Sequence, residues 1–516
     1  MTSTMTTTPS IEPISNRRAW AAVAVLSASL LVVTMDMTIL NIALPEMAAE
    51  LRPSANQQLW IVDVYSLVLA GLLVSFAAIA DRWGRKRMLM LGYAIFFAVS
   101  LLVLLADTAE SVIALRALLG IGGAMIMPNT LSLIRVIFTD ASKRATALSI
   151  WAAVSGLGAA VGPFVGGFLL EHFSWHAAFL VNVPLMLIAI VAGVLILPES
   201  KVANAGRWDA VAAALSLVGM TLVVWAVKDF GKEASFAQPT ALLALVIGVG
   251  ALVCFVRRCL RSEHPLLDIG LFRNRPFSAG IIAALGTTFA MLAALLLLTQ
   301  WLQLVDQSSP IESGIRLIPV ALAAAFASLL APPLARVIGA RSVLAGGLAL
   351  AGIGLLVVAF GPEDLTYGFV LVGMLFVGMG TGSLAIASAM IMLGSPEDKA
   401  GNAGALEETS YELGGTLGVA VLGSISALVY RNQLAGSAAL DQAGGEAAAQ
   451  AKDSLGGAVD VSGQLGLPAL ATDAGAAFTQ SLQTAGLVGG VLMLVVAAAV
   501  FIMTPKGTDI SSSSHG

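Results

Sequence analysis

Charged residues and cysteines are scarce in this sequence. Asp, Glu, Lys and Arg make up 11% of its 516 residues, whereas soluble domains carry about 25%. The net charge of −4 provides no basic surface for nucleic acid. Cys254 and Cys259 are poorly spaced for a disulfide on one helix, and a metal site would need further ligands. We therefore interpret both as ordinary thiols.

The sequence also lacks the motifs of soluble enzymes and of ATP-driven machines. No nucleophile–base pair, metal-ligand cluster or GxxxxGK[ST] nucleotide loop is present. This predicts a protein that is not an enzyme and that holds no metal or organic cofactor. Residues 1–18 are polar and lack the pattern of a cleavable signal peptide. We expect them to be disordered and the first apolar segment to remain in the mature chain.

Apolar residues dominate what is present. The chain is 58% hydrophobic and has a mean hydropathy of +0.91, which is typical of a membrane protein. About 20 apolar residues form one membrane-spanning helix. Windows of this kind lie at about 20–44, 57–80, 88–106, 110–134, 146–170, 176–197, 210–227, 239–256, 277–304, 312–335, 342–360, 365–393, 402–430 and 480–503. We predict an all-α polytopic membrane protein with fourteen transmembrane helices.

Lys and Arg are unequally distributed between the two sides of this arrangement. If the N-terminus is cytoplasmic, most of them fall on the cytoplasmic side, as the positive-inside rule requires. We therefore predict that both termini are cytoplasmic.

The segment "ADRWGRKRMLMLG" after the second window resembles "ARVIGARSVLAGG" after the tenth. This faint repeat suggests two six-helix halves, an organisation used by alternating-access transporters.

The predicted chain has five consecutive parts. They are a cytoplasmic N-terminus (1–18), a six-helix bundle (19–200), two linker transmembrane helices (201–265), a second six-helix bundle (266–503) and a cytoplasmic tail (504–516). Within the second bundle, residues 431–479 are rich in Ala, Gly, Asp and Gln and contain no spanning run. We expect a mobile or partly helical external loop there.

Two motifs lie where helices meet. "DRWGRKRM" (81–88) concentrates charge at a cytoplasmic turn, and we interpret it either as a positive-inside anchor or as a latch in which Asp81 and Arg82 connect helices. In "GLGAAVGPFVGGFLL" (156–170) small residues share one helix face. They allow close approach of another helix, and the choice between ordinary packing and a special role stays open. This face comprises Gly158, Gly162 and Gly166, with Pro163 and Gly167 beside them.

Arg116 is the one cation well inside a predicted span, and a buried Arg needs a partner. It lies roughly 9 Å from the outer end of its helix, and Asp36 lies roughly 12 Å from the outer end of the first. These depths match, so we expect the two to face one another. Arg116 would favour the charged form of Asp36 against desolvation. Such a pair suits a proton carrier, although a static structural ion pair is the alternative. Asp63 is near the end of its span, where an interfacial role and substrate contact are equally plausible.

The segment "GALEETSYELGG" places three glutamates inside one predicted span. Each ionised carboxylate costs roughly 2.5–3.5 kcal/mol there on insertion scales. Glu408 and Glu412 share a helix face, whereas Glu407 is about 140° from Glu412 and can face elsewhere as a helix–helix hydrogen-bonding group. Two acids in a cavity repel each other and are relieved by a cation or by protons. With Thr409 and Tyr411 nearby, we expect a site that exchanges a lipophilic cation for protons.

Together these segments resemble the major facilitator superfamily, specifically its fourteen-helix drug:proton antiporters that export quaternary ammonium compounds and dyes. "DRWGRK" is similar to the cytoplasmic gating motif, with Asp81, Arg82, Gly84 and Arg85, although Ala77 stands where a glycine is usual. "RALLGIGGA" and "MDMTILNIALP" are similar to motifs that contain Arg116 and Asp36. "GAAVGPFVGG" resembles the antiporter motif, and "GALEETSYELGG" resembles a stretch whose acids help to recognise cations.

The resemblance implies an exporter of lipophilic cationic drugs, dyes and antiseptics, driven by the proton gradient without another cofactor. It implies a bacterial inner-membrane location, contact with membrane lipid and no nucleic-acid partner, and we expect a monomer. Proton coupling is assigned to Asp36 and Arg116, and substrate binding to Asp63, Glu407, Glu408, Tyr411 and Glu412. Export of an endogenous metabolite, such as an amino acid or siderophore, is the alternative, and a non-transporting membrane sensor is a third interpretation.

Overall fold

The structure is a computed structural model. It describes residues 15–53, 55–138, 140–201, 209–233, 238–262, 265–396 and 399–507. Most of the predicted N-terminal segment and most of the predicted C-terminal tail lie outside these ranges. Every regular element in the described ranges is a helix, in agreement with the predicted all-α class.

The N-terminal half consists of long apolar helices joined by short turns. They are α1 (Asn16–Leu51), α2 (Ala55–Trp83), α3 (Arg85–Leu102) with the 3-10 turn η1 (Val103–Leu105), α4 (Ala109–Ile137), α5 (Ala141–His172), α6 (Ala177–Leu180) and α7 (Asn182–Ile196). The first helix begins within the segment predicted to be disordered. The sixth predicted span is divided between α6 and α7, which meet at Val181.

Two linker helices follow, α8 (Ala210–Glu233) and α9 (Pro239–Arg261). Asp209 caps the start of α8 by accepting from the backbone N–H groups of Val211 and Ala212, at 3.1 and 3.0 Å. Arg258 of α9 donates to the same carboxylate over 2.6 Å. This hydrogen bond is the main reason why the pKa of Asp209 lies below its ordinary value. The pair therefore connects the two linker helices by a charge-assisted bond.

The C-terminal half repeats the long helices and adds short ones. It contains η2 (Ile269–Arg273), α10 (Arg275–Leu304), α11 (Pro310–Ile338), α12 (Ala340–Ala359), α13 (Tyr367–Gly380), α14 (Ser383–Leu393), α15 (Ala400–Leu434), α16 (Ala438–Ala443), α17 (Gly445–Asp453), α18 (Leu455–Leu465) and α19 (Pro468–Met503). The predicted span 365–393 is two helices, α13 and α14, because the chain turns at Thr381 and Gly382.

The segment predicted to be an external loop differs from its predicted limits. The last helix begins at Pro468, not near 480, and α16, α17 and α18 occupy most of the remainder. The partly helical alternative is therefore the one observed. Tyr430 donates its hydroxyl to the Ala451 carbonyl over 2.9 Å, and Ser437 donates to Asp473 over 2.5 Å. These bonds join the short helices to the ends of α15 and α19.

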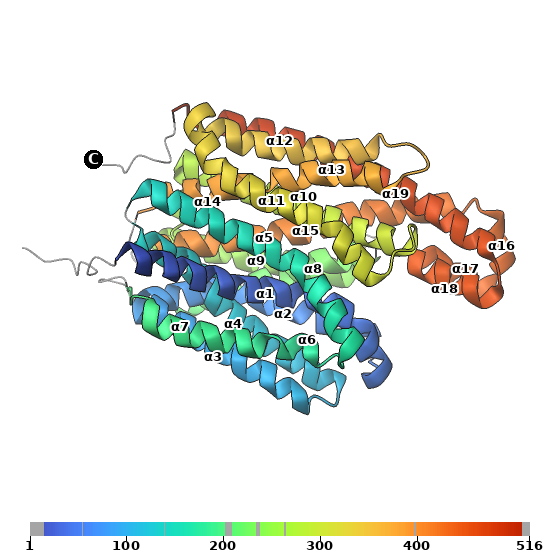
Figure 1. Cartoon of the computed structure of the whole chain (residues 1–516), viewed down its shortest axis with the longest axis horizontal. Coiled ribbons are helices and arrows are strands. Elements are labelled where there is room, and N and C mark those ends of the chain that lie inside the picture. The colour runs from blue at the N-terminus through green and yellow to red at the C-terminus, as the bar shows by residue number, and fades with distance from the viewer. Residues whose placement is uncertain are drawn as a thin grey trace, which may run out of the picture.

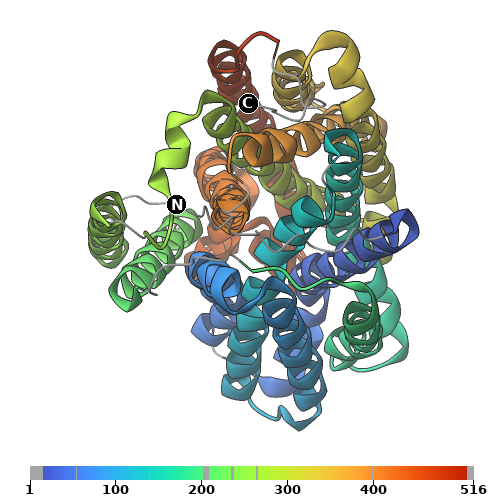
Figure 2. The ribbon, with the colours of Figure 1, turned by 90° about the vertical axis from the view of Figure 1, so that its left-hand side faces the viewer.

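The long helices run side by side, with α16, α17 and α18 at one end of the bundle (Figure 1). Helix α1 begins and α19 ends at the opposite end, which we call the terminal end. Figure 2 looks onto this end: the two halves lie on either side of the centre, and α8 and α9 lie on one flank. There α8 packs on α2 and α15, and elsewhere α5 packs on α11, so these contacts join the halves.

Thirteen helices in the described residues are long and apolar enough to cross a membrane. The chain is therefore a multi-pass membrane protein in its composition and architecture. The remaining predicted span, 146–170, lies within α5, which is 32 residues long. Several of its side chains are outside the described part of the chain, so the count of fourteen stays a prediction.

Glycines set the distance between paired helices in both halves. A β-carbon on Gly158 would collide with the Thr34 hydroxyl of α1, and one on Gly162 would collide with the Thr38 hydroxyl. In the other half, a β-carbon on Gly414 of α15 would collide with the Thr288 hydroxyl of α10. Helices α5 and α15 occupy equivalent places in the two repeats. In both halves, therefore, a glycine of this helix packs directly on a threonine of the neighbouring helix.

Candidate functional site

Asp36 and Arg116 form a buried ion pair inside the N-terminal half, as their matched depths predict. Arg116 Nη1 donates to Asp36 Oδ2 over 2.7 Å, and both side chains are almost completely buried. Arg116 Nε also donates to the Ile61 carbonyl over 3.3 Å, and its guanidinium lies 4.5 Å from the centre of the Tyr65 ring. Helices α1, α2 and α4 thus hold this pair from three sides.

A third residue of this cluster was not found by sequence reasoning. Asn182, the first residue of α7, donates its side-chain N–H to Asp36 Oδ1 over 2.7 Å and is fully buried. Both oxygens of Asp36 therefore accept a hydrogen bond. No spacing rule relates residue 36 to residue 182, and the only available signal is a polar side chain in the otherwise apolar run "AFLVNVPLMLI".

A cavity of about 680 Å³ lies between the two halves. It is lined by α1, α2, α4 and α5 on one side and by α10, α11, α14, α15 and α19 on the other, and it extends to the junction of α17 and α18. Three acids, Glu408, Glu412 and Asp453, are among the lining residues, and no Lys, Arg or His is among those described. The remaining walls are apolar, aromatic or hydroxyl-bearing, which suits an apolar cation.

Glu408 and Glu412 line this cavity together, as their spacing on one helix face predicts. Both lie on α15, whose cavity-facing residues continue toward Tyr430 at turn-by-turn spacing. Glu408 is buried, and its Oε1 has no hydrogen-bond partner in the described structure. A buried unpartnered carboxylate oxygen has a high cost unless a proton or a cation binds it.

Glu407 does not line the cavity and is fully buried behind it. Tyr411, which does line the cavity, donates its hydroxyl to Glu407 Oε1 over 2.6 Å. The Tyr411 ring lies near the indole of Trp151 from α5, with centroids 6.4 Å apart. Trp151 in turn donates to the Thr130 hydroxyl over 3.0 Å. A chain of contacts therefore runs from the hidden glutamate, through the cavity wall, into the other half.

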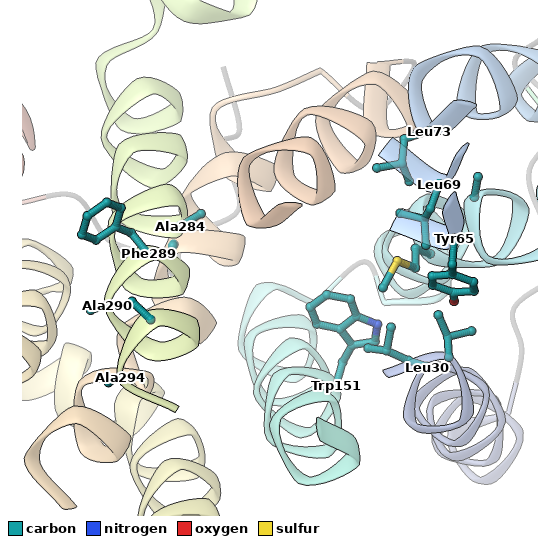
Figure 3. Packing of buried hydrophobic residues seen from close by; sticks show 14 of the residues in the cluster. Leu30, Tyr65, Leu69, Leu73, Trp151, Ala284, Phe289, Ala290 and Ala294 are labelled. Carbon is teal, nitrogen blue, oxygen red and sulfur yellow. The ribbon is translucent and has the colours of Figure 1, made fainter. Parts of the chain in front are cut away.

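The buried apolar side chains around these aromatic residues belong to one hydrophobic cluster that extends through both halves. Figure 3 shows Leu30, Tyr65, Leu69 and Trp151 gathered between α1, α2 and α5, while Ala284, Ala290 and Ala294 follow α10.

Asp63 lies in α2, but its side chain is outside the described part of the chain. Its predicted role in binding is therefore neither supported nor opposed by the geometry.

Comparison with known proteins identifies the family. The model of the Major Facilitator Superfamily matches residues 26–419. The chain belongs to the major facilitator superfamily. It is therefore a membrane transporter and not an enzyme, and the family predicted from the motifs is confirmed.

Relatives of this superfamily member include proteins of named function. The multidrug efflux pump LfrA of Mycolicibacterium smegmatis is 41% identical over 489 residues, which cover 94% of this chain and 96% of that protein. The methyl viologen resistance protein SmvA of Salmonella typhimurium is 35% identical and covers 87% of this chain, with 90% of SmvA aligned. These alignments span nearly the whole bundle.

Solved structures of other superfamily members share the fold at low sequence identity. The human organic anion transporter MFSD10 (TETRAN) has a TM-score of 0.59 at 13% identity, covering 92% of this chain and 99% of its own. An inward-facing, unoccupied bacterial homologue of the human lysosomal transporter Spinster has a TM-score of 0.56 at 17% identity, covering 95% and 98%. At these identities the likeness establishes the architecture alone.

The predicted gating motif lies at the junction of α2 and α3. Asp81 pairs with Arg85 over 2.8 Å, and both are buried, whereas Arg82 donates to the Ala78 carbonyl of its own helix. The ion pair described at this junction therefore joins Asp81 of α2 to Arg85 of α3, and the predicted role of Asp81 and Arg82 as a latch between helices stays a prediction. Gly84 has φ +126, a conformation that other residues rarely adopt, and Glu199 lies where its β-carbon would be.

The predicted repeat is visible in the backbone at this junction. Gly339, between α11 and α12, also has a positive φ, of 84°. In the register that aligns Gly84 with Gly339, the second copy has Arg336 where the first has Asp81, so it contains no equivalent carboxylate. The turn is therefore repeated in both halves, while the buried ion pair belongs to the first half.

Contacts between the halves at the terminal end come from a residue that sequence reasoning missed. Arg135, near the end of α4, donates to the Met392 carbonyl and to both the hydroxyl and the carbonyl of Ser395, beyond the end of α14. A β-carbon on Gly404 of α15 would lie 3.1 Å from the Pro128 carbonyl of α4. The halves thus meet closely here, whereas the cavity extends toward α17 and α18.

The predicted antiporter motif faces α1. A β-carbon on Gly162 would lie 2.9 Å from the Met35 carbonyl, and one on Gly166 would lie 2.9 Å from Ile39 Cγ1. Gly167 is buried, and the side chain of Pro163 is outside the described residues. This face therefore packs on protein, one turn from Asp36.

Proposed function

We propose that this transporter exports lipophilic cations, including drugs, dyes and antiseptics, in exchange for protons. The observation that carries the proposal is the charge of the cavity. Its described lining contains Glu408 and Glu412 without a basic side chain, within walls that are otherwise mainly apolar, and the third acid of the lining, Asp453, pairs with Arg431. In a low-dielectric cavity this arrangement attracts cations and disfavours anions.

Exchange follows from competition for the same carboxylates. When Glu408 and Glu412 are both charged they repel each other, and either a cation or protons relieve that repulsion. An organic cation that leaves the cavity is therefore replaced by protons, and protons that leave are replaced by a cation. Coupled to alternating access between the two halves, this competition moves the two in opposite directions.

The ion pair of Asp36 and Arg116 supplies a second, separate titratable site. Neither residue lines the cavity, although Met37 of α1 and Met127 of α4, on the same two helices, do. A cation in the cavity therefore does not contact the Asp36 carboxylate in this structure. We assign proton coupling to this pair, and substrate charge recognition to Glu408, Glu412 and the adjoining Tyr411. Glu407 acts through its bond to Tyr411.

The names of two relatives support this substrate class. LfrA is named a multidrug efflux pump and SmvA a methyl viologen resistance protein. Methyl viologen is a flat organic dication, and two carboxylates in one cavity match two positive charges. Sequence identity of 35% over 457 residues makes a similar substrate class a reasonable proposal for this chain.

The same proposal includes the arrangement in the membrane. We propose fourteen spanning helices with α5 among them, both termini on the cytoplasmic side of a bacterial inner membrane, and a monomer that needs only the proton gradient. The basic loops at the terminal end support this orientation.

Proteoliposomes with an imposed pH gradient test the function. Wild-type protein should accumulate ethidium and methyl viologen while the gradient lasts and stop when an ionophore collapses it. Glu412→Gln should weaken transport of the dication about tenfold or more, equivalent to about 1.4 kcal/mol, and transport of the monocation by less. Asp441→Asn removes an exposed acid of α16 and is the matched control. Equal losses for both substrates would contradict charge matching, and transport that ignores the gradient would contradict proton coupling.

A further inference from the structure

Asn182 contains a buried polar atom without a partner. Its side-chain nitrogen donates to Asp36 Oδ1 over 2.7 Å, but its own Oδ1 has no hydrogen-bond partner in the described structure. The residue is fully buried. Such an unsatisfied acceptor is costly, and native proteins keep few of them without a reason.

The orientation of this amide follows from the charge of Asp36. An ionised carboxylate only accepts hydrogen bonds, so its neighbours must present donors. Arg116 Nη1 donates to Oδ2 and Asn182 donates to Oδ1, each over 2.7 Å. The arrangement in the structure is therefore the one that suits charged Asp36, and the amide oxygen of Asn182 is the atom left over.

Protonation of Asp36 changes which arrangement is satisfied. The new O–H cannot lie on Oδ2, because Arg116 stays protonated and presents only donors there. The proton must therefore reside on Oδ1, facing Asn182, where two donors would meet. Half a turn about the last side-chain bond of Asn182 brings its unpartnered oxygen to that position. The amide then accepts the proton of Asp36 without any backbone movement.

We propose that Asn182 is a positioning residue of the proton site, whose amide donates to charged Asp36 and, after turning over, accepts from neutral Asp36. This inference rests on the proposed role of Asp36 as a proton carrier. It explains why an amide, which can both donate and accept, stands opposite an acid that must exist in two forms.

Few other titratable groups are near Asp36. Arg116 approaches from α4, and the Tyr65 ring of α2 lies against the Arg116 guanidinium, with its centre 4.5 Å away. Residues 146–170 of α5 and all of α6 and α7 contain no ionisable side chain. Helix α2 contains two acids: the side chain of Asp63 is not among those described, and Asp81 lies at the far end of the helix, paired with Arg85. A pH effect of changing Asn182 is therefore expected to report on Asp36 itself.

Two substitutions separate the two roles of the amide. Asn182→Leu removes both donor and acceptor. Because bonds to a charged group are about twice as strong as neutral ones, the charged form of Asp36 loses more. The pH of half-maximal proton-driven export should move upward by roughly half to one unit. Asn182→Asp keeps an acceptor and adds a repelling charge, so its upward shift should be larger. Asn129→Leu is the matched control, since Asn129 is buried in the same half and bonds to the Met125 carbonyl.

The measurement is gradient-driven ethidium export from proteoliposomes between about pH 5 and 9, with substrate-induced proton release from purified protein as a second readout. The expected order of midpoints is wild type and Asn129→Leu, then Asn182→Leu, then Asn182→Asp. Lower activity with an unchanged midpoint in both Asn182 variants would overturn the inference, because a merely structural role does just that. If Asn182→Leu does not fold, the nearly isosteric Asn182→Asp decides alone.

A parallel Asp36→Asn protein distinguishes this inference from the proposed function. If Asp36→Asn loses gradient-driven export while the Asn182 variants keep the wild-type midpoint, only the role of Asn182 is wrong. If Asp36→Asn keeps the wild-type pH profile, Asp36 is not the proton site and both proposals fail at this residue.

Discussion

Gly162→Ala should destabilise the protein although it introduces a better helix former. The added β-carbon would collide with the Thr38 hydroxyl and lie 2.9 Å from the Met35 carbonyl oxygen of α1. The hydroxyl can rotate, but the carbonyl belongs to the backbone of α1 and cannot. Since non-bonded heavy atoms pack at about 3.5–4.0 Å, α1 and α5 must separate by roughly 0.5–1 Å.

The size of the effect follows from two opposing contributions. Replacing a helical glycine by alanine stabilises a protein by about 0.4–1 kcal/mol where there is space. One extra methyl in a packed contact costs about 1–3 kcal/mol, and a gap of 0.5–1 Å loses a quarter to a half of the dispersion energy of each affected atom pair. The packing cost therefore exceeds the gain. The same substitution at Gly346 of α12, which has no atom within 4 Å of its would-be β-carbon, should give the gain alone.

The assay is the thermal unfolding midpoint in detergent, followed by tryptophan fluorescence, for both alanine variants. Gly162→Ala should unfold below wild type and Gly346→Ala at or above it. In proteoliposomes, Gly162→Leu should abolish export or make the vesicles leak protons. A Gly162→Ala midpoint at or above that of Gly346→Ala would refute the close contact between α1 and α5, and this face would then be facing lipid.

Three further outcomes are expected. Arg135→Leu removes the bonds that join α4 to the end of α14. A cysteine introduced by Ser395→Cys should therefore react with a thiol reagent severalfold faster in the Arg135→Leu variant than in a protein that keeps Arg135. Equal rates would show that this contact does not close the terminal end. Asp81→Asn deprives buried Arg85 of its charged partner and should slow exchange. Substrate affinity in detergent should change by less than tenfold, because Asp81 and Arg85 both lie outside the cavity. A larger loss of binding would argue against a conformational role. Tyr411→Phe keeps the ring but leaves a buried glutamate oxygen without its donor, which should cost about 1–3 kcal/mol of stability, and an unchanged unfolding midpoint would show that this bond contributes nothing.

Properties that depend on neighbours along the chain were predictable from the sequence. The membrane-spanning windows follow from runs of apolar residues, and the common face of Glu408 and Glu412 follows from the 100° rotation per residue of a helix. The turn at Gly84 follows from a glycine within the charged segment "DRWGRKRM". The pairing of Asp36 with Arg116 was predictable because membrane depth acts as a shared coordinate for residues far apart in sequence.

Helix limits were less predictable where the ends of a helix do not coincide with the ends of an apolar run. Helix α19 begins at Pro468, before the apolar window. Its first turns are too polar to be part of that window, but they are helical because they pack on α16 and α18. The run 365–393 is apolar throughout, yet the chain turns at Thr381 and Gly382. Hydropathy reports where a segment is soluble in lipid, and it does not report where backbone hydrogen bonding is interrupted.

Tertiary structure alone decided which side chains meet across helices. Asn182 reaches Asp36 because α7 packs on α1, and Arg135 reaches Ser395 because α4 meets the end of α14. The sequence places each of these residues at a depth in the membrane but not at an angle around the bundle. That angle is set by the mutual packing of all the helices, through contacts such as Gly162 against Thr38, and no local pattern encodes it.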